Sequence, residues 1–303
     1  MIWRKQGLLF EKPKDLGWAA SHAALPIARP DAASDRVRLL VSTRDAQGRA
    51  RVAGAELDLD EPGGVVFSPT PLLDLGALGA FDDNGVTTSC CVEQDGLVYL
   101  FYSGWSLGVT VPFYLGIGCA VSEDGGETFS RVSEAPIVGR SRVDPFLTAS
   151  PFVLVEEGRW RMWYVSATEW EPREDGPRHR YLIKYAESDD GLQWRREGLV
   201  CIDYTGAEEY AIARPCVIRD GDLYRMWYSH RGPAYRVGYA ESADGLSWER
   251  KDEDAGIDVS PSGWDDEMVE YPFVFDHQGG RHMLYNGNGY GRTGVGHAIL
   301  EDA

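Results

Sequence analysis

Basic residues and long apolar stretches are both scarce in this sequence of 303 residues. Lys and Arg number 30 against 48 Asp and Glu, which gives a formal net charge of −18. Because a nucleic-acid backbone or an anionic membrane surface requires a basic footprint, this balance argues against both as partners. No apolar run reaches the roughly 18 residues of a membrane span, and the apolar patch near the N-terminus is too short for a signal peptide. We therefore expect a cytoplasmic protein.

Cysteine is also rare, and its spacing suits neither a metal site nor a disulfide framework. The five cysteines form no Cys-x-x-Cys pair and are odd in number, so we expect reduced, buried thiols and no metal. We expect no cofactor either. Aromatic residues, by contrast, are abundant, with ten Trp and fifteen Tyr, and these residue types favour β-strands.

Several segments of the chain repeat one another. Residues 150–166, 214–230 and 271–287 overlay, and each copy is typical of two strands around a tight turn. In each copy a Pro is followed thirteen residues later by a Tyr, and residues 88–104 form a fourth copy with Ser89 in the Pro position. The Pro/Tyr pairs are Pro151/Tyr164, Pro215/Tyr228 and Pro272/Tyr285.

A second repeated element follows these copies. Residues 181–194 and 235–248 both suggest two strands around an Asp-Gly turn, with a looser version at 116–129. One unit therefore contains four strands, and units start 62, 64 and 57 residues apart, counted from Ser89 to Pro151, Pro215 and Pro272. Four-stranded units at such a period predict the blades of a β-propeller.

Five units fit the chain as a single domain, residues 1–303. We expect blade 1 at about 16–75, blade 2 at about 82–140, blade 3 at about 144–204, blade 4 at about 208–260, and blade 5 at about 264–302 plus 1–12. The chain ends before the last blade has a fourth strand, and the stretch from Trp3 to Leu9 matches the fourth strand of blade 3. The predicted fold class is all-β: a five-bladed β-propeller with four antiparallel strands per blade, its ring closed by the N-terminal strand (about residues 2–10).

The connections on the two faces of such a propeller differ in their chemistry. Those on one face are short turns, whereas those on the other, such as 103–116, 166–180 and 262–270, are long and rich in polar and aromatic residues. Functional residues are commonly carried by loops on a rigid scaffold, so we expect the second face to bind the ligand. Acids recur just ahead of the inner strands, and we expect them to hold the adjoining loops by accepting backbone N–H groups.

Two residues break the repeat at the start of the inner strands. Glu270 stands where blades 2, 3 and 4 have Thr or Ala, and Arg214 stands where blades 2, 3 and 5 have Thr, Ser or Tyr. In the expected fold both could point toward the central channel, where a buried charge needs a partner or a ligand. An ion pair between Glu270 and Arg214 is one interpretation, and a ligand for each is the other.

The expected architecture and the triplet Glu270-Tyr271-Pro272 resemble glycoside hydrolase families 43 and 32, with similarity also to the mannoside phosphorylases of family 130. In family 43 a Glu-Gly-Pro triplet carries the general acid, so the resemblance implies that Glu270 is the proton donor. The family's other two acids would each be an Asp before an inner-strand Pro, but Ser150 and Arg214 stand there. The second carboxylate that hydrolysis requires would then come from a loop, as one of Asp83, Asp144 and Glu209.

Basic, polar and aromatic side chains of the same face are candidate substrate-binding groups, because arginines suit phosphate or carboxylate and aromatic rings stack on sugars. These candidates are His22, Arg44, Trp105, Trp170, Arg214, His230, Arg231, Tyr271, Asn286, Asn288 and Tyr290. Some also have a purely structural interpretation: His22 as a core histidine, Arg44 as the partner of Asp45, and the aromatic rings as blade packing. A Ca²⁺ ion among acids such as Asp83 and Glu209 is the alternative to a metal-free channel.

The sequence thus predicts a carbohydrate-active enzyme that cleaves or transfers at a glycosidic bond of a small, anionic or phosphorylated sugar, in polysaccharide or natural-product biosynthesis. Its partner would be a sugar or nucleotide-sugar substrate, with no nucleic acid and no membrane. The alternative is a non-catalytic sugar-binding propeller. The missing second Asp favours this alternative, whereas the solitary Glu270 favours the enzyme.

Overall fold

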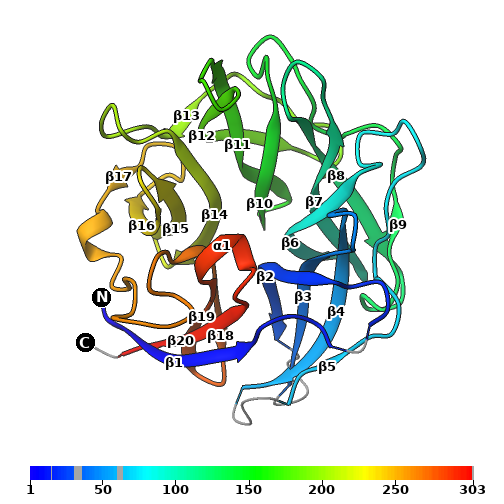
Figure 1. The fold of residues 1–303 in the computed structure, drawn as a ribbon. Coiled ribbons are helices and arrows are strands. Elements are labelled where there is room, and N and C mark those ends of the chain that lie inside the picture. The colour runs from blue at the N-terminus through cyan, green and yellow to red at the C-terminus, as the bar shows by residue number, and fades with distance from the viewer. Residues whose placement is uncertain (15, 31–35, 60–63, 302–303) are drawn as a thin grey trace.

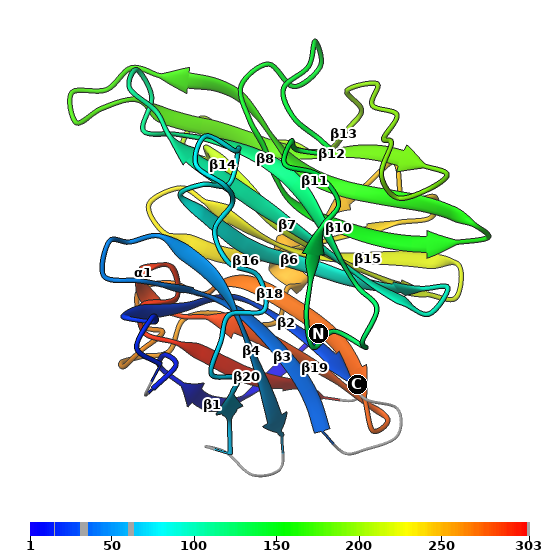
Figure 2. The same cartoon turned by 90° about the vertical axis from the view of Figure 1, so that its right-hand side faces the viewer.

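The computed structural model describes residues 1–14, 16–30, 36–59 and 64–301, and these residues form an all-β protein. Consecutive strands pair antiparallel in groups of four, which we call strand sets 1 to 5. Figure 1 shows the sets arranged around a common centre, and Figure 2 shows them from the side. No helix of the described segments is long and apolar enough to cross a membrane.

The strand sets follow the chain in order. Set 1 comprises β2 (Ser21–Pro30), β3 (Arg36–Arg44), β4 (Ala50–Asp58) and β5 (Val66–Phe67). Set 2 comprises β6 (Gly85–Gln94), β7 (Leu97–Leu107), β8 (Phe113–Ser122) and β9 (Ser130–Arg131). Set 3 comprises β10 (Thr148–Glu156), β11 (Arg159–Glu171), β12 (Arg178–Ser188) and β13 (Val200–Ile202). Set 4 comprises β14 (Ala211–Asp220), β15 (Leu223–Arg231), β16 (Tyr235–Ser242) and β17 (Glu249–Arg250), and is followed by a short 3₁₀ turn, η1 (Asp252–Asp254).

Set 5 is built from both ends of the chain. It comprises β18 (Glu270–His277), β19 (Gly280–Asn286), β20 (Val295–Leu300) and β1 (Trp3–Phe10), and a four-residue turn, α1 (Asn288–Gly291), links β19 to β20. β1 runs antiparallel to β20, with Trp3 opposite Leu300 and Phe10 opposite Val295. The N-terminal strand is therefore the fourth strand of the last set, as the sequence predicts.

The first strands of the sets surround the centre of the molecule. β2, β6, β10, β14 and β18 are neighbours in this order, and β18 in turn lies beside β2 (Figure 1). By hydrogen bonding, sets 1 and 2 form one sheet and sets 3 and 4 another, each joined by a single parallel residue pair, whereas set 5 is a separate sheet. The outer strands β5, β9, β13 and β17 are only two or three residues long, which leaves little exposed edge for unwanted pairing.

A recurring hydrogen bond joins neighbouring sets near the centre. The backbone N–H of Leu25, Thr88, Ser150 and Tyr271, each at the bulge of its inner strand, donates to a side-chain oxygen on the second strand of the preceding set. The acceptors are Asn286, Ser42, Ser103 and Ser229, at 2.7–2.9 Å. The contact from Leu25 to Asn286 links the first set to the last. These bonds satisfy donors that the bulges leave unpaired.

The Asp-Gly turns of the second repeated element are held by their own side chains. Asp190 and Asp244 each accept two backbone N–H groups of the turn, and Trp194 and Trp248 each donate through Nε1 to the glycine carbonyl at 3.0 Å. The same sequence therefore folds in the same way twice, which explains why the repeat is visible in the sequence.

One hydrophobic core cluster joins buried residues of all five sets. Its largest fully buried side chains include Trp163 and Trp227 on β11 and β15, at equivalent places of sets 3 and 4. The cysteines are all free, and four of them are buried, as the sequence predicted for reduced thiols. Among the described residues no group of His, Cys, Asp and Glu could hold a metal ion.

Candidate functional site

The recurring acids ahead of the inner strands bind tyrosine side chains. Asp82, Asp144 and Asp265 are buried and accept hydrogen bonds from the hydroxyls of Tyr102, Tyr164 and Tyr285, the tyrosines of the repeated segments. Each acid also meets a base: Arg131 for Asp82, Lys184 and Arg196 for Asp144, and Lys5 for Asp265. We expected the acids ahead of the inner strands to hold loops through backbone N–H groups. The second acid of each pair does so, because Asp83, Glu209 and Asp266 accept the N–H groups of Gly79, Thr205 and Gly263. Asp82, Asp144 and Asp265 instead bind side chains.

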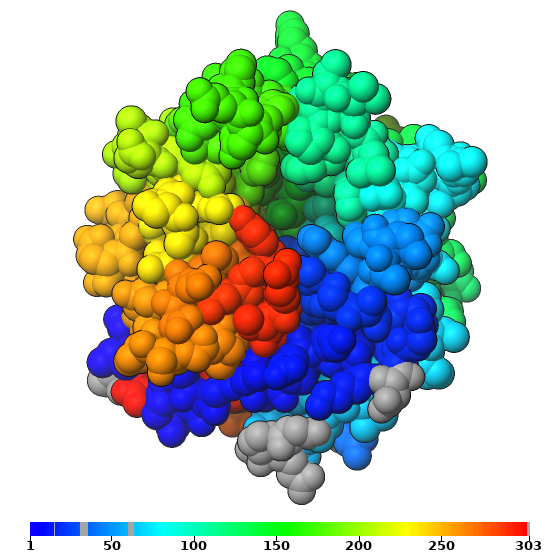
Figure 3. All heavy atoms as spheres, in the orientation of Figure 1, coloured from blue at the N-terminus to red at the C-terminus, as the bar shows by residue number. Residues whose placement is uncertain are grey.

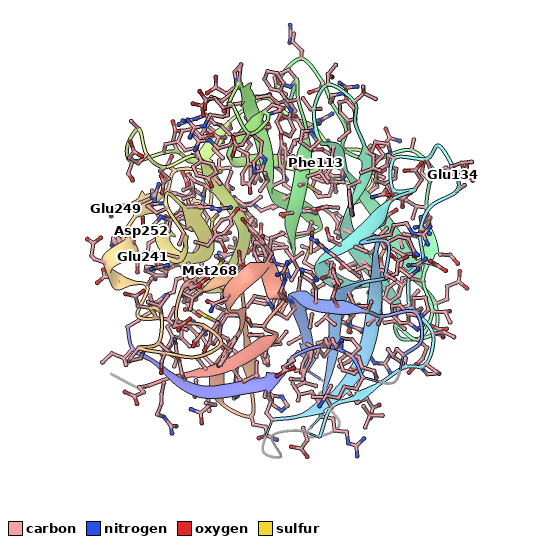
Figure 4. The ribbon with its side chains drawn as sticks, in the orientation of Figure 1. Phe113, Glu134, Glu241, Glu249, Asp252 and Met268 are labelled. Atoms are coloured by element: carbon pink, nitrogen blue, oxygen red, sulfur yellow. The ribbon has the colours of Figure 1, made fainter. Side chains whose placement is uncertain are left out.

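Set 4 uses a different acid for the same purpose. Tyr228 donates to Asp252, which follows β17 and also pairs with Arg250 at 2.5 Å. Figure 4 labels Asp252 at the outer side of this set, next to Glu241 and Glu249. The exposed Glu208 occupies the repeat position in the sequence, so a shift of the acid to the outer strand preserves the contact with the tyrosine.

The three loop acids proposed as partners of Glu270 are all engaged elsewhere. Asp144 is fully buried in the contacts above, and Asp83 accepts the N–H of Gly79 at 3.0 Å. Glu209 receives Arg250 at 2.8 Å and His230 at 2.9 Å. Burial raises the pKa of Glu209, but the hydrogen bonds from Arg250 and His230 outweigh burial and bring the pKa to about 2. Within the described segments, no hydrogen bond joins any of the three to Glu270.

Glu270 differs from all of these acids. It opens β18 opposite Asn286, and its side chain is fully buried. Neither carboxylate oxygen has a hydrogen-bond partner of normal geometry. Burial raises the pKa of Glu270 to about 8, and the backbone N–H of Tyr290, the charge of Arg231 and the hydroxyl of Tyr271 only moderate that rise. A carboxyl group of this kind is protonated at neutral pH and can donate its proton.

The backbone next to Glu270 adopts a conformation unusual for an L-residue. Tyr271 has φ of 57°, and Leu25, Ser150 and Arg214, which also precede an inner-strand Pro, have φ of 55°, 44° and 55°. This left-handed region is disfavoured by the Cβ atom. A bulge of this kind re-aims the side chain of the inner strand.

Tyrosines and one arginine surround Glu270. The hydroxyls of Tyr181 and Tyr235 lie 2.6 Å apart. Tyr235 and Tyr271 lie near enough to Glu270 that its carboxylate, when ionised, raises the pKa of both tyrosines. The Arg231 guanidinium lies 5.2–5.5 Å from the ring centres of Tyr210, Tyr235 and Tyr290 and donates to the Tyr290 hydroxyl. The Nε atom of Arg231 is buried without a partner.

Aromatic rings continue from Tyr181 toward the loop tips of sets 2 and 3. His179 stacks on Tyr181 with ring centres 4.6 Å apart and planes within 4°, and Trp170 meets His179 edge-on at 5.6 Å. Phe113 then contacts Trp170 at 5.4 Å. Figure 4 labels Phe113 and, on another side of the centre, Met268, which packs beside Tyr210 and Tyr235.

Several predicted binding residues have structural contacts of their own. Arg214, only 2% exposed, donates to the carbonyls of Thr88, Leu25 and Pro26. Burial lowers the pKa of Arg214 to about 10, so the group still carries its charge at neutral pH. An ion pair between Arg214 and Glu270 is not present among the described residues.

The two predicted asparagines hold loops. Asn286 donates to the carbonyls of Ala23 and Gly294, each at 2.7 Å, and Asn288 accepts the N–H groups of Glu267 and Met268. Tyr290 is 37% exposed at the edge of the site, where residues 289–291 all have positive φ, so α1 is a left-handed turn rather than a regular helix.

The remaining candidates lie in two other places. His22 is buried, with Arg44 at the neighbouring pair position on β3, opposite Ser21. The suggested pair of Arg44 with Asp45 is not formed, since Asp45 binds Arg49 and Arg51 instead. Trp105 covers the backbone of Gly85, where a Cβ atom would lie 1.9 Å from the indole nitrogen, so the packing interpretation describes this residue.

The structure therefore brings together Glu270, Tyr271, Tyr290 and Arg231, and leaves the other candidates around them. Figure 3 shows a hollow at the centre of the face that carries α1, bounded by residues from early, middle and late parts of the chain. Sequence reasoning missed Tyr181, Tyr235, His179 and Arg292. A signal for the first two was present, because Tyr181 and Tyr235 are the first residues of the two best-matched copies of the second repeated element.

Comparison with solved structures defines the class of fold. The protein BT0996 in its RGII complex superposes with a TM-score of 0.77 at 17% identity, covering 99% of this chain and 92% of that one. A thermostable family-43 glycoside hydrolase gives 0.67 at 16% identity, covering 96% and 93%. The Bombyx mori GH32 β-fructofuranosidase BmSUC1 gives 0.65 at 13% identity, covering 97% and 62%. The chain thus has the propeller fold of the family 43 and family 32 glycoside hydrolases.

Comparison with curated sequences defines the family. The uncharacterized proteins MT1551 and Rv1502 of Mycobacterium tuberculosis, from strains CDC 1551 / Oshkosh and ATCC 25618 / H37Rv, are 45% and 44% identical over 304 residues, which is 100% of each chain. The chain belongs to the family of these two mycobacterial proteins. No protein-family model matches the sequence.

Proposed function

We propose that this chain is a carbohydrate-active enzyme that acts at a glycosidic bond, with Glu270 as the proton donor. The single observation that carries the proposal is that Glu270 is fully buried at the start of the inner strand β18 and that neither carboxylate oxygen has a hydrogen-bond partner of normal geometry. A buried, uncompensated acid is costly in a structural role, whereas a general acid has to be protonated near neutral pH. The glycoside hydrolase fold supports the same class of chemistry.

The proposal includes a single five-bladed domain with the blade limits given above. The circular order of β2, β6, β10, β14 and β18 supports it, as does the bond from Leu25 to Asn286 between the first and last sets. In this arrangement the inner strands present Glu270 and Tyr271 to one end of a central channel, and the rigid ring fixes their geometry.

The reaction assigns a defined task to each group. Glu270 gives its proton to the leaving oxygen, the bond from that oxygen to the anomeric carbon breaks, and its electron pair stays on the leaving oxygen. An oxygen of water or phosphate then bonds to the anomeric carbon, and the proton that it releases restores Glu270. Tyr271 and the Tyr181–Tyr235 pair orient the sugar by hydrogen bonds, and Arg231 favours an anionic sugar.

The acceptor oxygen is the point at which this site departs from a two-carboxylate hydrolase. Asp83, Asp144 and Glu209 are each held by other groups, and both standard geometries require a second free acid. We therefore favour transfer to an acceptor that arrives with its own negative charge, such as phosphate, over transfer to water. A sugar or nucleotide sugar of polysaccharide or natural-product biosynthesis remains the proposed substrate.

The test is an NMR-followed incubation of the protein with aryl glycosides, sugar phosphates and nucleotide sugars, with and without phosphate. Glu270→Gln is the test variant, and Glu267→Gln, an exposed acid of the same loop, is its matched control. We expect turnover that Glu270→Gln lowers by at least about 100-fold and that Glu267→Gln leaves unchanged. Binding of these compounds without turnover in any form of the protein would favour the rival, a non-catalytic sugar-binding propeller.

A further inference from the structure

Some arginines of this acidic protein have no carboxylate partner. Among the described residues, six arginine side chains form no ion pair: Arg44, Arg140, Arg142, Arg214, Arg231 and Arg292. They lie at the ends of β3 and β15, on the connection between β9 and β10, at the bulge of β14, and on the loop between β19 and β20. In a chain with 48 acids and 30 basic residues, an exposed arginine that has no carboxylate partner can bind an anionic ligand.

Two of these arginines flank the same short stretch of β2. Arg44 is paired with Ser21 across β2 and β3. Arg292 follows Gly291, whose backbone lies so close to β2 that a Cβ atom there would be 2.7 Å from the Ala23 carbonyl oxygen and from the Ala24 Cα. Both arginines are exposed. On β2, His22 stands between Ser21, which faces Arg44, and Ala23, which Gly291 approaches, and the His22 side chain is buried.

His22 lies near enough to both arginines that their positive charges affect its pKa. Burial first, and then the charges of Arg44 and Arg292, lower the pKa of His22 to about 4. His22 is therefore neutral at ordinary pH and neither adds positive charge nor partners the arginines. Two positive charges held near each other repel, and an oxyanion placed between them removes this repulsion.

The same stretch of β2 is fixed relative to Glu270. Asn286 pairs with Glu270 across β18 and β19, and its side chain bonds the Ala23 carbonyl and the Leu25 N–H. The charge of Arg44 also reaches Tyr271. A ligand group at Arg44 and Arg292 would therefore lie at a constant position with respect to the proton donor, as a specificity subsite requires.

We propose that Arg44 and Arg292 form a subsite for an oxyanion of the substrate, a phosphate or carboxylate group, beside β2. The substrate class is then a sugar phosphate or an acidic sugar whose charged group binds these arginines while its glycosidic oxygen reaches Glu270. The inference rests on the proposed function for the position of the sugar, but not for the binding of the anion. Guanidinium groups suit both oxyanions because they donate two parallel hydrogen bonds.

The test is a calorimetric titration of the full-length protein at constant ionic strength and pH 7. The probes are inorganic phosphate, glucose 1-phosphate and glucuronate, with methyl glucoside as the neutral probe. The variant Arg44→Gln/Arg292→Gln is compared with Arg140→Gln/Arg142→Gln, which removes the same charge from other unpaired arginines. We expect the first variant to weaken binding of the preferred anion by about tenfold or more, and the second by less than about twofold.

Each outcome supports or overturns the subsite. A preference for glucose 1-phosphate and inorganic phosphate would identify a phosphate subsite, and a preference for glucuronate a carboxylate subsite. Two results would overturn the proposal. One is an equal loss of anion binding in the two double variants. The other is no anion binding by the wild-type protein at concentrations up to about 50 mM, which corresponds to a binding free energy weaker than about 2 kcal/mol. Glu270→Gln separates the two proposals, because it should abolish turnover and still bind the anion.

Discussion

The proton held by Glu270 should be visible in the stability of the protein. Burial raises the pKa of this carboxyl group from 4.5 to about 8 in the folded chain. Between these two pH values the folded protein keeps a proton that the unfolded chain has released, so unfolding releases a proton. The free energy of unfolding therefore falls as the pH rises through this window, and above pH 8 the loss is complete.

The size of the effect follows from the width of the window. One group changes the free energy of unfolding by at most ~1.4 kcal/mol per pH unit. The window from 4.5 to about 8 spans about 3.5 units, so the full loss is at most ~5 kcal/mol. Glu270→Gln cannot ionise and lacks this loss. Its buried amide costs about 1–3 kcal/mol, independently of pH.

Urea unfolding of wild type and Glu270→Gln at pH 5, 7 and 9 measures the effect, because every other group titrates alike in both proteins. Relative to the wild type, the stability of the variant should rise by about 2–4 kcal/mol between pH 5 and pH 9. Glu267→Gln, in the same loop and exposed, should gain nothing. Parallel curves for wild type and Glu270→Gln would refute the reasoning, since Glu270 would then be ionised at neutral pH and unable to donate a proton.

Two further predictions concern the scaffold. Ser229→Ala should lower the free energy of unfolding by about 1–2 kcal/mol, because the Tyr271 N–H that donates to Ser229 at 2.7 Å loses its acceptor. Ser166→Ala, on β11 of set 3, removes a buried hydroxyl that has no hydrogen-bond partner and should change the free energy of unfolding by less than about 0.5 kcal/mol. Tyr164→Phe should cost about 1–2 kcal/mol by thermal unfolding, since it removes a hydrogen bond to the buried Asp144. Equal effects of Ser229→Ala and Ser166→Ala, or a neutral Tyr164→Phe, would contradict these assignments.

The sequence predicted the strands well because the residues that determine each strand and turn lie within the repeated segment itself. The Asp-Gly turns, the inner-strand Pro and the matching N-terminal strand act within or between copies of one unit, so aligning the chain on itself revealed them. Glu270 stood out for the same reason: it departs from a pattern that the other copies share.

The partners of the acids could not be predicted, because they come from distant parts of the chain. Asp265 meets Lys5, which is 260 residues away, and Arg214 reaches the carbonyls of Thr88 and Pro26 across the centre. Arg292 follows a left-handed turn whose approach to β2 depends on the backbone of Gly291. No periodicity in the sequence indicates such contacts, since they depend on how the sets surround the centre.

The most direct test of Glu270 as proton donor is the dependence of turnover on the leaving group. Rates of wild type and Glu270→Gln would be compared on two glycosides of the same sugar. One carries 2,4-dinitrophenol, which can leave without being protonated, and the other carries a simple alcohol, which has to be protonated before it leaves. We predict that the variant loses at least about 100-fold on the alcohol glycoside and less than about tenfold on the dinitrophenyl glycoside. Equal losses on both substrates would contradict a role for Glu270 in protonating the leaving oxygen.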